Sequence, residues 1–203
     1  MLEFVMKWYR CGKEFLCHAI GLPLLGLRIY LFPIFLQAGW QKFASFDSQV
    51  RWFGNSLGLP FPELMVFLAG TAELVGACLL LLGLMTRAIT IPLMVTMLVA
   101  AFLVHADNGW LALSDSTSWL ANERVMEAAE KKEIIRDWVN EHEDAKWLQS
   151  SGSVTILNNG MEFAITYFLM LFVLFFYGGG RYVSIDYWID KWRRPPSTEP
   201  TTE

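Results

Sequence analysis

The sequence predicts an all-α fold: a polytopic membrane protein built as a four-transmembrane-helix bundle, with an extra amphipathic helix in its outer loop. Of the 203 residues, 54% are hydrophobic and only 18% are charged, whereas about a quarter of the residues in soluble domains are charged. Four runs hold at most one charge each, and they lie at 20–40, 64–84, 88–104 and 161–180. A helix that crosses a bilayer requires roughly 20 apolar residues, so each run is long enough to form one.

The apolar runs place the four spanning helices near 20–41, 62–84, 87–105 and 160–178. The membrane domain then covers residues 1–190. Residues 1–19 carry charges throughout and show no apolar core of a signal peptide, so we expect an interfacial lead-in to the first helix. The last stretch, 191–203, is rich in Pro, Thr and Glu and is expected to be a disordered cytoplasmic tail.

The basic residues predict the orientation of the helices. Eight of them flank helix ends on one side of the membrane: Lys7, Arg10, Lys13, Arg87, Arg181, Lys191, Arg193 and Arg194. The short loop on the other side holds only Lys42 and Arg51. The positive-inside rule therefore predicts that both termini are cytoplasmic and that residues 106–160 face outward.

The outer segment differs in composition from the rest of the chain. Residues 107–146 hold ten acids and five bases, a net charge of −5. Within it, 122–143 has apolar residues near helical spacing and an i,i+4 pair of Glu127 and Lys131. We expect a helix at the outer membrane–water boundary. Its role is either that of a solvated amphipathic cap or that of an acidic surface that docks a partner or collects cations.

Arg28 and Glu73 are charges within the apolar runs. A charge at mid-bilayer costs roughly 2.5–3.5 kcal/mol on insertion scales, so such residues are usually paired or functional. At 1.5 Å per residue, Glu73 lies about 16 Å from the outer end of its helix and Arg28 about 12 Å from the inner end of its own. In a core about 30 Å thick these levels nearly coincide. The sequence therefore predicts an Arg28–Glu73 pair, either a fixed contact between helices or the border of a polar pocket that binds a quinone or relays a proton.

Three residues at the outer boundary are weak candidates for a metal site: His105, Asp107 and Glu162. Their spacing matches no metal-binding signature, so no metal is assigned. His105 is alternatively an interfacial anchor. Glu162 is alternatively the third residue of a helix capped by Asn159, as in a capping box.

Several motifs together resemble the DoxX family of small four-helix membrane proteins. They are Arg28, AGWQK at 38–42, LPFPEL at 59–64, AELVGACLLLLGLMTR at 72–87, His105 and GGGRYVSID at 178–186. A longer subgroup of this family is also similar in VHADNGW at 104–110 and NNGMEFAITYFLMLFVLFF at 158–176. Compared with minimal members, the chain has an outer insertion at about 111–157.

The resemblance implies an integral protein of the bacterial inner (plasma) membrane. Some members of the family are linked to membrane oxidoreductase complexes, including thiosulfate:quinone oxidoreductase subunits, and others accompany a superoxide dismutase and a sulfurtransferase. The longer subgroup is seen beside genes for small exported copper-buffering peptides. The family has no agreed set of catalytic residues, so Arg28, Glu73 and His105 carry over only as matching polar positions.

Two functions follow as hypotheses. The first is a non-catalytic accessory that supports a periplasmic or membrane partner, docked on 111–157, in handling redox or metal stress, with copper as the metal the resemblance suggests. The second is the membrane subunit of a quinone-linked oxidoreductase, with a quinone pocket near Arg28 and Glu73. Cys11, Cys17 and Cys78 form no CxxC pair, and no haem or flavin signature occurs, which disfavours an autonomous redox enzyme. Besides the lipid bilayer, a homo-oligomer is conceivable, and no nucleic-acid partner is expected.

Overall fold

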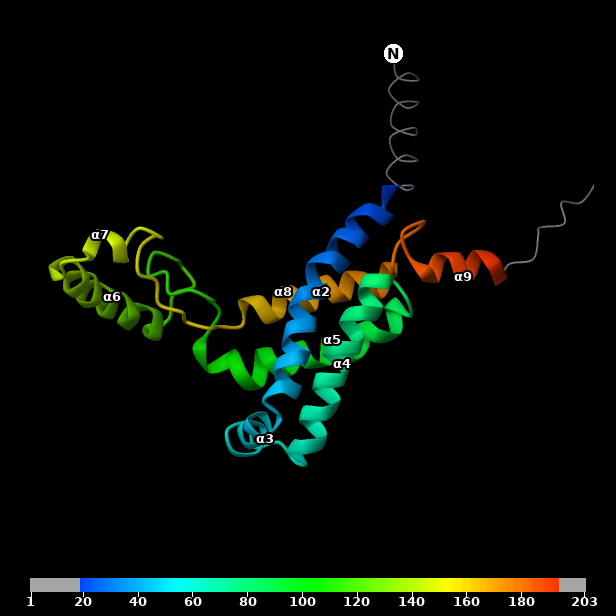
Figure 1. Ribbon diagram of the computed structural model, residues 1–203, viewed down its shortest axis with the longest axis horizontal. Helices are drawn as coiled ribbons and strands as arrows, with labels where there is room; N and C mark the ends of the chain where they lie inside the picture. Colours follow the sequence, from blue (N-terminus) through cyan, green and yellow to red (C-terminus); the bar gives the residue numbers. More distant parts are fainter. Residues whose placement is uncertain (1–18, 194–203) are drawn as a thin grey trace, which may run out of the picture. The chain divides into compact units, whose positions relative to one another are not determined.

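The computed structural model describes residues 19–193, and its helices follow one another along the chain as Figure 1 shows. Residues 1–18 and 194–203 lie outside the described part, and with them the expected interfacial lead-in and most of the tail predicted to be disordered. The regular elements of residues 19–193 are helices, together with an isolated β-bridge between Leu113 and Leu157. The all-α fold class is therefore confirmed.

The four apolar runs form four apolar helices close to the predicted bounds. They are α2 (Gly21–Ala44), α4 (Pro62–Leu82), α5 (Thr86–Val99) and α8 (Glu162–Tyr177). The helix of α5 continues through a π-helical turn, Ala100–His105, and a 3-10 turn, Ala106–Asn108. Three of these helices are long and apolar enough to cross a membrane, whereas α8, with 16 residues, is shorter.

The remaining helices lie between or after the apolar ones. They are α3 (Phe46–Asn55), α6 (Glu123–Glu141), α7 (Ala145–Leu148) and α9 (Ile185–Arg193). The helix expected in the outer insertion is confirmed as α6, and the side chain of Asn122 caps it by accepting from the amide of Val125 at 3.0 Å. The sequence did not predict α9, which includes Lys191–Arg193, the first residues of the expected tail.

The chain divides into two compact units. Unit 1 comprises residues 1–96 and 169–203, of which 19–96 and 169–193 are described. Unit 2 comprises Met97–Phe168 and holds the outer insertion.

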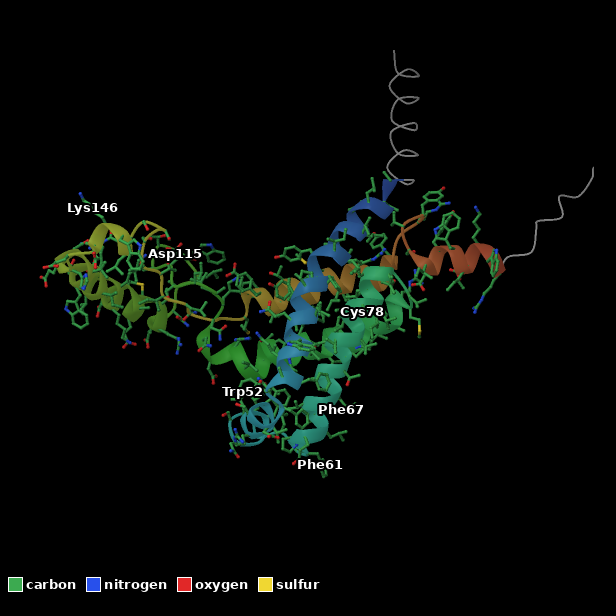
Figure 2. All side chains as sticks on the ribbon, viewed as in Figure 1. Trp52, Phe61, Phe67, Cys78, Asp115 and Lys146 are labelled. Atoms are coloured by element: carbon green, nitrogen blue, oxygen red, sulfur yellow. The ribbon has the colours of Figure 1, made fainter. Side chains whose placement is uncertain are left out.

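Unit 1 is organised around the close contact of α2 with α4. Gly39 lies against the backbone of Gly70 and Leu74, and a Cβ at Gly39 would come within 2.6 Å of the Leu74 nitrogen. The ring of Phe43 covers Gly70 in turn and meets Phe67 edge to face at 6.0 Å; Figure 2 labels Phe67 on α4. Small residues let helices approach closely in lipid, where van der Waals contact replaces the hydrophobic effect as the main attraction. These glycines therefore fix the antiparallel register of α2 and α4.

Backbone hydrogen bonds join two loop segments of unit 2, residues 109–112 and 158–162. The amides of residues 158–162 donate to carbonyls of Gly109, Trp110, Leu111 and Ala112 at 2.9–3.0 Å. Gly160 fits only because it lacks a Cβ, which would lie 2.4 Å from the Leu111 oxygen. The segments that match the VHADNGW and NNGMEF motifs thus pair with each other through their backbones.

Candidate functional site

The carboxylate of Glu73 forms a buried ion pair with Lys42. The Nζ of Lys42 lies 2.6 Å from Oε2 of Glu73, and their side chains are 18% and 4% exposed. Lys42 stands in the last turn of α2, so its long side chain reaches inward from the helix end to a carboxylate deep within α4. A charge-assisted hydrogen bond in this setting is stronger than one between neutral groups.

The predicted Arg28–Glu73 pair is therefore wrong. The register of α2 on α4 explains why. Gly39 lies against Gly70 and Leu74, and Arg28 is 11 residues earlier on the antiparallel α2, about 16 Å further along α4 at 1.5 Å per residue. That displacement carries Arg28 past Glu73 to the other end of α4. The depths inferred from helix ends assumed a different stagger of the two helices.

Arg28 is enclosed by backbone carbonyls. Its Nε donates to Leu80 O at 2.7 Å and its Nη2 to Leu81 O at 2.7 Å. Its Nη1 donates to Gly179 O, and both Nη atoms donate to Val183 O at 3.2 Å. Leu80 and Leu81 lie in the last turn of α4, where carbonyls lack intrahelical partners and the helix dipole favours a cation. Arg28, which is 1% exposed, thereby joins the end of α4 to the chain that follows α8.

Asp186 completes this end of unit 1. Its carboxylate oxygens accept from the amides of Met85 at 2.7 Å, just before α5, and of Thr86 at 2.9 Å, the first residue of α5. Its own amide donates to Gly83 O at 3.0 Å. A carboxylate at a helix N-terminus satisfies unpaired amides and the helix dipole. Gly83 has φ +66°, and a Cβ there would lie 2.8 Å from Nη1 of Arg28. The GGGRYVSID segment thus fastens the α4–α5 turn.

Arg28 and the Lys42–Glu73 pair differ in how many N–H donors remain free to bind a ligand. A guanidinium has five N–H donors, and the five hydrogen bonds of Arg28 occupy all of them. It has no donor left for a quinone oxygen. An ammonium has three donors, and within residues 19–193 Lys42 donates one hydrogen bond, to Glu73. Of Arg28, Lys42 and Glu73, the last two are therefore the ones that keep hydrogen-bonding capacity.

Two of the three metal candidates at the outer boundary, His105 and Glu162, take part in hydrogen bonds of unit 2. Nδ1 of His105 lies 2.9 Å from the carbonyl oxygen of Asn159. A carboxylate oxygen of Glu162 accepts from the amide of Ala112 at 2.9 Å, so Glu162 does not close the capping box expected with Asn159. Asp107 is exposed. Among residues 19–193, no group of three or more His, Cys, Asp or Glu side chains is placed to hold a metal ion.

Asn158, whose buried side chain joins three segments of unit 2 by hydrogen bonds, was not identified from the sequence. The side chain is 1% exposed. Its amide nitrogen donates to Asn108 O at 2.8 Å and Leu111 O at 2.7 Å, and its oxygen accepts from Nε of Arg124 at 3.2 Å. The available signal was the asparagine pair in NNG. Lys42 was also missed as a partner, because it was counted among the basic residues of the short outer loop, whereas it lies in the last turn of α2.

An open polar hollow of about 390 Å³ lies in unit 2 between the 113–117 segment and α6. It is lined by both acidic and basic side chains, among them Asp115, Lys132, Glu133 and Arg136. Figure 2 labels Asp115, which lies in the segment before α6.

Comparisons with known proteins find one family and two uncharacterised relatives. The DoxX family profile matches residues 23–106. An uncharacterised membrane protein of Mycobacterium tuberculosis is 35% identical over 89 residues, which are 43% of this chain and 55% of the relative. An uncharacterised protein of Haemophilus influenzae is 37% identical over 105 residues, which are 46% of this chain and 75% of the relative. The chain thus spans about half the length of the mycobacterial relative. No solved structure matches it.

Proposed function

The chain belongs to the DoxX family of membrane proteins, and on that premise we propose that it is a non-catalytic membrane accessory whose unit 2 docks a partner protein. The partner is a periplasmic or membrane protein that handles redox or metal stress, with copper as the metal suggested by the resemblance. Unit 1 is the anchor, and the segment 111–157 carries the docking surface.

The observation that supports docking is the exposed side chains of α6 and α7. Trp138 and Trp147 are 69% and 74% exposed. On α6, Trp138 and Ile134 alternate at helical spacing with Glu130. Tryptophan is enriched at the centres of protein interfaces, whereas the carboxylate of Glu130 within the stripe disfavours insertion into lipid. A protein partner with basic and apolar groups fits this surface best.

Alanine at Trp138 and Trp147 tests the docking surface. The doubly substituted chain should insert in the membrane normally but lose its partner in a cross-linked pull-down. The matched control is Phe61→Ala, which removes a side chain of unit 1 that is 74% exposed; Figure 2 labels Phe61. Equal partner recovery from the wild-type chain and the double variant would refute the proposal.

A deletion provides an independent test. The hydrogen bonds of residues 109–112 with 158–162, and that of Ser114 N with Ile156 O at 3.0 Å, should stay intact. A short Gly/Ser linker in place of 116–154 therefore removes the docking surface alone. The shortened chain should still insert and remain monodisperse, and it should lose the partner. Retained partner binding would leave α6 as a cap without a docking role.

A second candidate function is the membrane subunit of a quinone-linked oxidoreductase. The observation in its favour is the Lys42–Glu73 pair between α2 and α4, because ionisable residues within membrane-spanning helices are a functional-site hypothesis by default. The ammonium would hydrogen-bond a quinone oxygen and Glu73 would exchange the proton. Solvent extraction of the purified protein should then recover quinone, and Lys42→Met with Glu73→Gln should abolish it. Extracts that contain no quinone would remove this candidate.

The orientation remains a proposal as well. The lysine and arginine distribution supports cytoplasmic termini in the inner membrane. Reporter fusions after Arg87 should read as cytoplasmic, and fusions after Lys146 as exported. The reverse result would place residues 111–157 in the cytoplasm and exclude a periplasmic partner.

A further inference from the structure

The helix α9 carries an exposed apolar stripe that lies outside both the docking surface of 111–157 and the Lys42–Glu73 pair. Ile185, Trp188, Ile189 and Trp192 follow the i, i+3, i+4, i+7 spacing that puts them on one face. Ile185 is 38%, Trp188 51% and Trp192 95% exposed. In Figure 1, α9 turns away from the end of α8 as a separate helix.

The start of α9 is fixed to the ends of the apolar helices. Asp186 bonds the α4–α5 turn, as described above, and Arg28 holds the carbonyl of Val183. The amide of Tyr187 donates to Oγ of Ser184 at 3.3 Å, and the indole of Trp188 donates to Tyr182 O at 3.1 Å. Because α4 ends and α5 begins at this turn, α9 starts at the level where these helices leave the membrane.

Cationic side chains border the apolar stripe. Nζ of Lys191 lies 5.1 Å from the centre of the Trp188 ring, and Arg193 is in the last turn of α9. The guanidinium of Arg181 lies 5.7 Å from the centre of the Tyr182 ring. Helix α9 has two carboxylates, those of Asp186 and Asp190. The carboxylate of Asp186 accepts hydrogen bonds from the amides of Met85 and Thr86. At 100° per residue, Asp190 projects from the side opposite the stripe.

We propose that α9 binds the lipid surface and lies in the plane of the lipid–water boundary. The apolar stripe enters the boundary of the acyl chains, and Lys191 and Arg193 bind lipid phosphates. Tryptophan rings suit this position because their apolar bodies and polar N–H groups match its two sides. The stripe differs from the exposed face of α6 in having no carboxylate among its members.

Single labelled cysteines test the proposal in the full chain. The three native cysteines are replaced by serine, and Trp192→Cys or Asp190→Cys then carries an environment-sensitive fluorophore. Each protein is placed in phosphatidylcholine nanodiscs that contain a headgroup-level spin-labelled lipid. The label at 192 should show a blue-shifted emission and strong quenching, and the label at 190, the matched control, should show neither. Trp192 is 95% exposed, so its replacement leaves the fold intact.

Two results would overturn the proposal. Equal quenching at the two positions would mean that α9 does not present one face to lipid. Absent quenching at 192 would mean that water or another protein covers the stripe. In the same labelled chain, Lys191→Glu with Arg193→Glu should weaken the quenching at 192, and unchanged quenching would exclude the lipid phosphates as their ligands.

Discussion

Nζ of Lys42 and Oε2 of Glu73 lie 2.6 Å apart, so a lysine at the end of α2 neutralises the carboxylate within α4. Removal of one partner leaves a buried charge without compensation, which commonly costs about 3–5 kcal/mol, whereas removal of both can be nearly neutral. Lys42→Met and Glu73→Gln should each destabilise the protein in detergent, and the double variant should recover much of the loss. Unfolding measured for all four chains gives the coupling energy.

The matched control for this cycle uses Arg28. Within residues 19–193, Arg28 donates to backbone carbonyls and Glu73 accepts from Lys42, so the two side chains share no hydrogen-bond partner. The effects of Arg28→Lys and Glu73→Gln should therefore add. A coupling between Arg28 and Glu73 as large as that between Lys42 and Glu73 would restore the pair expected from the sequence.

Arg28→Lys should destabilise unit 1 although the charge is kept. Lysine lacks the planar fork that lets Arg28 reach four carbonyls at once. Each hydrogen bond to a charged group contributes about 1.5–3 kcal/mol, so loss of two or three should lower the midpoint of thermal unfolding strongly. Arg87→Lys is the control, because Arg87 donates to Phe176 O at an exposed position. Similar unfolding midpoints for the two variants would contradict a structural role specific to Arg28.

Asp186→Ala should loosen the start of α5. Loss of a capping side chain typically costs about 0.5–2 kcal/mol, and here two amides, those of Met85 and Thr86, lose their acceptor. Hydrogen exchange followed by mass spectrometry should show faster exchange at these amides. Asp190→Ala, on the same helix, should leave their exchange unchanged. Slow exchange in both variants would mean that the α4–α5 turn does not depend on the carboxylate.

Gly160→Ala should disrupt unit 2 while unit 1 stays folded. The added Cβ would lie 2.4 Å from Leu111 O and 2.6 Å from Trp110 O, and backbone atoms cannot yield as a flexible side chain can. Limited proteolysis should cut residues 113–157 faster in this variant. Gly152→Ala is the control for adding a methyl group, because a Cβ at Gly152 would have no neighbouring atom within 4 Å. The φ of Gly152, +122°, makes this substitution strained locally. Equal cleavage of Gly160→Ala and the wild-type chain would exclude the predicted clash.

Thr117→Val should raise the pKa of Asp115. The Thr117 hydroxyl donates to the Asp115 carboxylate at 2.6 Å, and with the Thr117 amide at 2.9 Å it holds the pKa of Asp115 below its ordinary value. A lowered folded-state pKa stabilises the turn above the unfolded pKa, and this contribution is lost as pH falls through the folded value. Carboxyl NMR titration should place the transition of the variant at higher pH. The control Ser116→Ala should leave the pKa of Asp115 unchanged. An unchanged pKa in Thr117→Val would contradict the role of the Thr117 hydroxyl.

The sequence by itself determined which segments are helices in the membrane. Long apolar runs decide this, because every backbone polar group in lipid must be satisfied within its own helix, and the four observed apolar helices follow the runs closely. The helix of the outer insertion was also predictable, since its spacing and its Asn122 cap are local signals. Neither property depends on neighbours distant in the chain.

Only the tertiary structure decided which charge meets which. Lys42, Arg28 and Glu73 were all visible in the sequence, but their pairing depends on the stagger of α2 against α4, which Gly39 and Gly70 set by close backbone contact. A shift of one helix by a few turns exchanges the partner of Glu73 without altering either helix. The hydrogen bonds of Asp186 to the α4–α5 turn likewise join residues about 100 positions apart. Local patterns contain no information about such contacts, because their geometry arises only when the helices pack.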